Sequence, residues 1–210
     1  MNIDELVKQH KIIPVLTQND PDLAVKIVEA LAAGGILCVE VALRTPNSIR
    51  VIEALSRALP QVCVGAGTLR DPNDFSRVQQ AGAQFAVSPG ATHALLVEAE
   101  NWDLPYLPAA STVSEILALQ DRGYSTIKLF PAGQLGGIAY IKAISAPLTD
   151  VLFVPSGGVD SNNLGDYLAL PQVASVSGSW MMPADAIECN DWQCLTQLAR
   201  TGLQSISSKE

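Results

Sequence analysis

The sequence alternates short apolar runs, many of them rich in β-branched residues, with longer amphipathic segments. A short apolar run bounded by turn residues is typical of a buried strand, and a longer segment with apolar residues three and four apart is typical of a helix. The strand candidates are KIIPVLT from Lys11, ILCVEVAL from Ile36, VCVGAG from Val62, QFAVSP from Gln84, PYLPAA from Pro105, STIKLF from Ser125, VLFVPSG from Val151 and VASVSG from Val173. Eight strand and helix units in 210 residues predict an α/β protein with a (β/α)₈ TIM barrel. A doubly wound sheet is the alternative, because the number of units alone does not exclude it.

The segments between the runs carry signals for helix ends and none for a second domain. Asp20-Pro21 and Asp71-Pro72 are each expected to open a helix, and Thr112 with Glu115 has the pattern of a capping box. Three glycines follow helical segments where a left-handed cap is expected: Gly34, Gly82 and Gly123. No change in composition, block of charge or low-complexity linker interrupts the chain. We therefore expect a single barrel domain over residues 1–210.

Composition excludes several classes of partner. The chain is 48% hydrophobic and 16% charged, which suits a globular protein with a large core. A net charge of −8 with only 13 Lys and Arg argues against nucleic acid as a partner, while an anionic small molecule stays possible. No apolar run is long enough for a membrane span and the N-terminus has no apolar signal core, so we expect no membrane association and a cytoplasmic location.

Four cysteines and two histidines give no recognisable metal-ligand spacing. The cysteines form no CxxC pair, so a structural zinc site or a disulfide framework is not expected, and we interpret them as core or surface thiols. The prediction is no metal and no cofactor. The cysteines are Cys38, Cys63, Cys189 and Cys194.

The run STIKLF is unusual because it places a lysine inside an apolar strand. Side chains on a strand alternate between its faces, so Lys128 points away from the face that Ile127 and Leu129 share. If both faces are buried, Lys128 points into the barrel, where an unpaired charge is costly. Two interpretations stay open: a lysine that reaches the barrel mouth or pairs with a carboxylate, and an amine nucleophile that desolvation favours in its neutral form.

Three polar residues near the ends of the second and third strands are further candidates. Glu40 faces inward in CVEVALRTP, either as an ion-pair partner of Lys128 or Arg44 or as a general acid/base. Arg44 ends that strand, where it is either a solvated loop residue or a ligand for a carboxylate or phosphate. Thr68 ends the motif GAGT. Its small residues either allow a ligand to approach the backbone or serve only to form a tight turn. In a barrel, catalytic groups are expected at these carboxyl ends of the strands.

The last two strands each end in a glycine-rich turn, PSGGV and SGSW. Turns that expose backbone N–H groups after strands seven and eight match the place where many barrels hold a phosphate. The residues concerned are Ser156, Gly157, Gly158, Gly178 and Ser179. Two such turns favour phosphate binding over ordinary chain reversal.

In order and spacing, the motifs VEVALRTP, GAGTL, AGAQFAVSPG, STVSEILAL, IKLFPA, PSGGV, DYLAL and GSWMMPADAI resemble the 2-keto-3-deoxy-6-phosphogluconate (KDPG) aldolase family. That family also includes enzymes that act on 4-hydroxy-2-oxoglutarate (KHG). The resemblance extends from about Ile12 to Arg200. It implies a class I, metal-independent aldolase on a (β/α)₈ barrel, usually a homotrimer, whose substrate is a phosphorylated 2-keto-3-deoxy sugar acid and whose product is pyruvate.

The resemblance also assigns roles to residues. It makes Lys128 the Schiff-base lysine, Glu40 the general acid/base, and Arg44 with Thr68 the ligands of the pyruvate carboxylate. The residues that it places around the substrate are Phe130 and Pro89 in the pocket wall, Gly157, Gly158, Gly178 and Ser179 at the phosphate, and Ser156, which keeps a hydroxyl where relatives usually have threonine.

The chain departs from the family pattern at a few positions. Gly133 and Gln134 follow FPA, where many relatives have a glutamate, and Thr17 stands near the place of a basic residue. These changes concern substrate range and leave the choice between KDPG and KHG open. From residues alone, two other functions stay open: a phosphate-binding isomerase or epimerase without a covalent intermediate, and a barrel that binds a phosphorylated ligand without catalysis.

Overall fold

The structure is a computed structural model and describes residues 2–207. Its strands are all paired in parallel. They are β1 (Ile12–Leu16), β2 (Cys38–Ala42), β3 (Cys63–Gly67), β4 (Ala86–Val87), β5 (Tyr106–Leu107), β6 (Ala109–Ala110), β7 (Thr126–Leu129), β8 (Leu152–Pro155) and β9 (Val176–Gly178). Each predicted run contains a strand. β5 and β6 are two halves of the fifth run, interrupted at Pro108, because proline has no N–H for the ladder.

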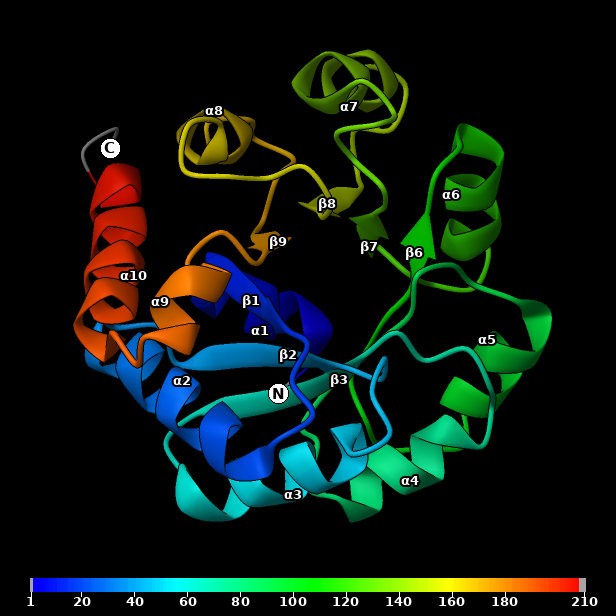
Figure 1. Cartoon of the computed structure of the whole chain (residues 1–210). Helices are drawn as coiled ribbons and strands as arrows, with labels where there is room; N and C mark the ends of the chain where they lie inside the picture. Colours follow the sequence, from blue (N-terminus) through cyan, green and yellow to red (C-terminus); the bar gives the residue numbers. More distant parts are fainter. Residues whose placement is uncertain (1, 208–210) are drawn as a thin grey trace.

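The strands close into a barrel (Figure 1). Six of them form a sheet in the order β5-β4-β3-β2-β1-β9, and three form a sheet in the order β6-β7-β8. The chain itself joins β5 to β6 through Pro108, and the parallel bridges Phe153 to Val173 and Ser156 to Ser177 join β8 to the β9 segment. The prediction of a (β/α)₈ barrel is confirmed, and the doubly wound alternative is wrong.

Helices surround the barrel (Figure 1). They are α1 (Ile3–Gln9), α2 (Pro21–Ala33), α3 (Ser48–Ala58), α4 (Asp74–Gln80), α5 (His93–Ala99), α6 (Val113–Gln120), α7 (Gly137–Ser145), α8 (Leu164–Leu168), α9 (Ala184–Glu188) and α10 (Trp192–Ser207). One helix follows each of the eight strands of the barrel, whereas α1 precedes the first strand and α9 is inserted between β9 and α10.

Most of the predicted helix ends are present. Asp20 caps α2 by accepting from the N–H groups of Asp22 and Leu23, and Thr112 forms the expected capping box with Glu115 at α6. The helix expected at Asp71-Pro72 begins three residues later, at Asp74.

One predicted glycine cap is wrong. Gly82 and Gly123 have positive φ as expected, but after α2 the left-handed residue is Gly35 rather than Gly34. Gly34 has a packing role instead, because a Cβ there would lie 2.6 Å from the Ala199 Cβ atom in α10.

The barrel interior divides into two ends. At the amino ends of the strands it is filled mainly by apolar side chains, and α1 adds Leu6 and Val7 to this inner cluster. The strand residues of the inner cluster are Ile13, Cys38, Cys63, Val87, Leu107 and Val154, and Phe85 and Ala174 precede β4 and β9. Helix α1 therefore covers the amino end of the inner cluster.

Candidate active site

Lys128 and Glu40 form a buried ion pair inside the barrel. The Nζ atom of Lys128 lies 3.1 Å from Oε1 and 3.2 Å from Oε2 of Glu40. Lys128 is 6% exposed and Glu40 is 2% exposed. The predicted alternation is confirmed, since Ile127 and Leu129 pack on the opposite, helix side of β7. A charged pair so far from solvent is costly to maintain unless both partners stay together.

A glycine on the neighbouring strand makes room for this pair. A Cβ atom at Gly67 would fall on the carboxylate of Glu40. Strand β3 lies beside β2 with Glu40 paired to Gly65, so Gly67 is the next residue on the same face. The sequence motif GAGT therefore provides space for the Glu40 side chain.

Phe130 lies beside the ion pair at the end of β7. The Nζ atom of Lys128 is 5.8 Å from the centre of its ring, a distance at which a cation is attracted to the aromatic face. The Ser111 hydroxyl donates to the Phe130 carbonyl at 2.6 Å, and the Tyr140 hydroxyl donates to the Ser111 carbonyl at 2.9 Å. These two bonds hold the segment that carries the aromatic ring.

Arg44 and Thr68 meet across the ends of β2 and β3. Arg44 Nε donates to Thr68 Oγ1 at 3.3 Å. Thr68 has a φ of 66°, a conformation that a β-branched residue avoids and that costs about 1–3 kcal/mol. Within residues 2–207 no hydrogen bond is recorded to the terminal nitrogens of Arg44, which leaves them available to an anion. Strain of this kind is typical of a functional site.

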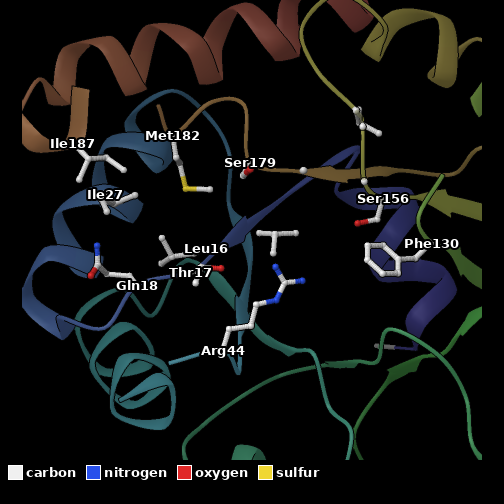
Figure 2. A pocket seen from close by; sticks show the side chains of 15 residues that line it. Leu16, Thr17, Gln18, Ile27, Arg44, Phe130, Ser156, Ser179, Met182 and Ile187 are labelled. Carbon is white, nitrogen blue, oxygen red and sulfur yellow. The ribbon is translucent and has the colours of Figure 1, made fainter. Parts of the chain in front are cut away.

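A cavity of about 310 Å³ opens at this end of the barrel (Figure 2). Figure 2 shows the Arg44 guanidinium pointing into it, with Thr17 on one side and Phe130 and Ser156 on the other. Seven predicted site residues line the cavity: Arg44, Phe130, Ser156, Gly157, Gly158, Gly178 and Ser179. The fold thus brings the second, seventh, eighth and ninth strand ends to one space.

The glycines of the PSGGV turn are required by its backbone. Gly157 and Gly158 have φ angles of 87° and 82°, where other residues are strained. The departure at Gly133 belongs to the same arrangement, because its N–H donates to the Gly157 carbonyl at 2.8 Å. A Cβ at Gly133 would lie 3.2 Å from that carbonyl oxygen, so a larger residue would push against the turn. Gln134 is exposed.

Four predicted residues are not part of this cavity wall. Lys128 and Glu40 are buried next to it, with Lys128 beside the Phe130 ring that lines the cavity. Pro89 follows β4, is partly exposed and is not part of the cavity wall, so its role stays a prediction. Thr68 borders a second cavity, of about 400 Å³, whose wall includes Arg70 and Asp74. Thr68 is connected to the first cavity through its hydrogen bond with Arg44, which lines that cavity.

Sequence reasoning missed part of the cavity wall. The missed residues are Val15, Leu16, Gln18, Ile27, Val159, Met182 and Ile187. Gln18 directly follows a predicted strand, a position that signals a ligand-facing loop in a barrel. Met182 and Ile187 belong to the segment around α9, for which the apolar pattern gave no signal.

Comparison with known proteins identifies the family. The model for the aldolase family described as KDPG and KHG aldolase matches residues 3–198. The chain belongs to this family. It is therefore an aldolase, a carbon–carbon lyase, and the resemblance found in the sequence motifs is confirmed.

The sequence similarity to curated relatives extends over nearly the whole length of this chain. The 2-dehydro-3-deoxy-phosphogluconate aldolase of Pseudomonas aeruginosa is 42% identical over 202 residues, which are 96% of this chain and 92% of that protein. The KHG/KDPG aldolase of Escherichia coli K12 is 42% identical over 193 residues, 92% of this chain and 91% of that protein.

Solved structures agree with the aldolase fold. The KDPG aldolase of Legionella pneumophila, with pyruvate captured at low pH as a covalent carbinolamine intermediate, superposes with a TM-score of 0.92 at 40% identity, over 95% of this chain and 97% of that one. The alpha subunit of tryptophan synthase from the same organism has a TM-score of 0.75 at 12% identity over 99% of each chain, which supports the fold alone.

The structure contains no candidate for a membrane-spanning helix. Between residues 2 and 207, none of the helices combines the length and the apolar character that crossing a bilayer requires.

Proposed function

We propose that this aldolase cleaves KDPG to pyruvate and glyceraldehyde 3-phosphate through a Schiff base on Lys128, and that it also cleaves KHG to pyruvate and glyoxylate. The observation that carries the proposal is the buried pair of Lys128 and Glu40 beside a cavity with a cationic side chain and glycine-rich turns. The names of the relatives from Pseudomonas and Escherichia and the captured carbinolamine in the Legionella enzyme support the same chemistry.

The ion pair supplies the first step. Transfer of one proton from Lys128 to Glu40 gives a neutral amine and a neutral acid, which suits a site that excludes water. The amine attacks the C2 carbonyl carbon, and Glu40 returns a proton to the oxygen, so that a carbinolamine forms. Loss of water then gives an iminium ion, whose nitrogen attracts electrons from the neighbouring carbon atoms.

The iminium ion makes cleavage of the C3–C4 bond possible. Glu40 accepts the proton of the C4 hydroxyl, directly or through a water molecule, and the electrons of the C3–C4 bond move into an enamine. The aldehyde leaves, Glu40 returns the proton to C3, and water hydrolyses the iminium ion to pyruvate and free Lys128.

Binding groups orient the substrate around this pair. Among residues 2–207 nothing is recorded as a partner of the terminal Arg44 nitrogens, so they can hold the C1 carboxylate by two parallel bonds, and Thr68 keeps the Arg44 side chain in place. On the far side of the cavity, the turns at Gly157-Gly158 and Gly178-Ser179 offer N–H groups and a hydroxyl for the C6 phosphate.

Substrate comparison tests the proposal. Pyruvate release is measured with KDPG, with the unphosphorylated sugar acid and with KHG, in the wild type and in Ser179→Ala. We expect the unphosphorylated sugar acid to be the poorer of the two sugar acids and Ser179→Ala to raise KM about tenfold for KDPG, with KM for KHG unchanged. An enzyme that releases no pyruvate from KDPG or KHG would contradict the proposal, and one that isomerises a sugar phosphate would support the proton-shuttling alternative.

We also propose that the chain acts as a homotrimer in the cytoplasm. The support is the family resemblance of its motifs over nearly the whole length. Light scattering on a size-exclusion column tests the oligomer, with an expected mass about three times that of one chain. A mass of one or two chains would contradict it.

A further inference from the structure

A cluster of metal-binding side chains lies at the amino end of the barrel, away from the catalytic cavity. The ligand atoms of His10, Cys38 and Cys63 all lie within 4.8 Å of one another. In residues 2–207 this is the one group of three or more histidine, cysteine or acidic side chains that converges in this way. The aldolase mechanism uses none of these three residues.

Three separate backbone elements hold the cluster in place. Cys38 and Cys63 are the first residues of β2 and β3 and are directly paired in the parallel ladder, so their side chains lie side by side on the inward face. His10 ends α1: its N–H donates to the Leu6 carbonyl at 3.0 Å, and its carbonyl accepts from the Ser175 hydroxyl at 2.7 Å. A ligand set fixed in this way loses little entropy when a metal binds.

The side chains match the ligands that zinc prefers. Zinc binds thiolate sulfur at about 2.3 Å and imidazole nitrogen at about 2.0–2.1 Å, so tetrahedral ligand atoms lie roughly 3.5–3.8 Å apart. The ligand atoms of the cluster lie at most 4.8 Å apart, which is close to that spacing. Among the described residues no hydrogen bond is recorded to the His10 ring, which leaves a ring nitrogen available to a metal ion.

Charge balance favours a divalent ion in this place. Two thiolates, a neutral imidazole and Zn²⁺ sum to zero, whereas a monovalent ion would leave a net charge. The surroundings are apolar, because Leu6, Val7 and Ile13 belong to the same inner cluster as the two thiols. An uncompensated charge in such a place is costly, and a neutral complex avoids that cost.

A third cavity, at the amino end, reaches the cluster at His10, while Cys38 and Cys63 are not part of its wall. It has a volume of about 260 Å³ and is lined by His10 together with Lys11, Ile36 and Leu203. The nearby ammonium group of Lys11 donates to the Ala174 carbonyl at 3.2 Å. The cavity therefore leaves room for a water molecule as a fourth ligand beside the histidine.

From this convergence we propose that His10, Cys38 and Cys63 bind one Zn²⁺ ion at the amino end of the barrel, with water as the fourth ligand. The site lies at the amino ends of β2 and β3, whereas the catalytic cavity opens at the carboxyl ends of the strands. It is independent of the proposed aldolase reaction.

Metal titration tests the site. Full-length protein is reduced, treated with a chelator and exchanged into buffer without either agent, then titrated with Zn²⁺ in competition with a chromogenic chelator. Co²⁺ is the optical probe, because two thiolate ligands give an intense charge-transfer band and tetrahedral geometry gives strong visible bands. We expect one equivalent of metal and a cobalt spectrum of two thiolates in a four-coordinate site.

Variants assign the ligands. His10→Gln keeps both thiols and changes a half-buried side chain, and Cys63→Ser removes one thiolate. Each is expected to weaken Zn²⁺ binding at least about a hundredfold, more than the loss of an outer-shell partner. The matched control, Cys189→Ser with Cys194→Ser, removes the two thiols nearer the surface and should bind like the wild type. Absence of Zn²⁺ binding in the reduced wild type, or binding lost only in the control, would overturn the proposal.

Discussion

The two ends of the barrel interior are built on the same strands but hold opposite kinds of side chain. The carboxyl end has a buried ion pair, strained backbone at Thr68 and turns rich in glycine. The amino end is packed with large apolar side chains and is covered by α1. The difference teaches that this fold places stability at one end and chemistry at the other, as TIM barrels generally do.

On β2 the two ends are only two residues apart. Cys38 and Glu40 share the inward face and are separated by about 6.6 Å along the strand. Burial raises the pKa of the Cys38 thiol well above its usual range, while the neighbouring Cys38 thiol lowers the pKa of Cys63. Two residues further along β2, the Glu40 carboxylate contacts the ammonium group of Lys128.

The largest expected effect comes from Lys128→Met. Cleavage of KDPG should fall at least about 10⁴-fold in kcat/KM, because the nucleophile is lost. The free energy of unfolding should fall by about 3–5 kcal/mol, because Glu40 is left buried without its partner. Pyruvate release and urea unfolding measure the two effects.

A double variant separates the two effects. Adding Glu40→Leu to Lys128→Met removes the orphaned carboxylate, so most of the stability should return while activity stays absent. A single variant that is as stable as the wild type would show that the pair is not a buried charge pair in solution.

A smaller effect is expected from Gly67→Ala. The added Cβ displaces the Glu40 carboxylate, so kcat should fall about 10²-fold, within the range for loss of general acid/base catalysis. The matched control is Gly90→Ala, whose Cβ would meet nothing within 4 Å. Equal kcat values for the two variants would refute the assigned position of Glu40.

Arg44→Lys should act mainly on binding. The lysine cannot make two parallel bonds to a carboxylate and cannot reproduce the bond from Nε to Thr68, so KM should rise roughly tenfold with kcat changed less. Steady-state kinetics with KDPG and KHG measure both values. A fall in kcat at unchanged KM would mean that Arg44 contributes only in the transition state.

The smallest effect on activity is expected at the amino end. Leu6→Ala should lower the free energy of unfolding by about 2–5 kcal/mol, because Leu6 is 1% exposed and its loss leaves a cavity. At a temperature where the variant is folded, kcat and KM should match the wild type. Leu117→Ala, at a 48% exposed position on α6, is the control and should cost less than about 0.5 kcal/mol. Altered kcat or KM in Leu6→Ala would contradict the conclusion that the amino end contributes to stability and not to catalysis.

Much of this arrangement could be predicted because it depends on local pattern. Strand alternation correctly oriented Lys128 and Glu40, and the glycines after strands seven and eight line the cavity at the carboxyl end, although their role in binding phosphate stays a prediction. Both signals depend on the order of neighbouring residues in the sequence, so they can be recognised without knowledge of tertiary contacts.

The remainder depends on contacts between distant residues. The need for Gly67 becomes visible only when Glu40 lies opposite, and Met182 joins the cavity through the loop around α9. Helix α1 had a local signal in its capping box of Asn2 and Glu5, which sequence reasoning did not use. His10 approaches Cys38 and Cys63 only because the barrel closes over α1. The spacing of these three residues in the sequence does not predict that they meet.

The most direct test of the central claim is the intact mass of the protein after incubation with pyruvate and sodium borohydride, for the wild type and Lys128→Met. Only an imine is reduced to a stable adduct. The account predicts that the wild type gains the mass of one reduced pyruvyl group and that the variant gains none. A folded wild-type protein that gains no mass, or a variant that gains as much, would contradict the assignment of Lys128 as the Schiff-base lysine.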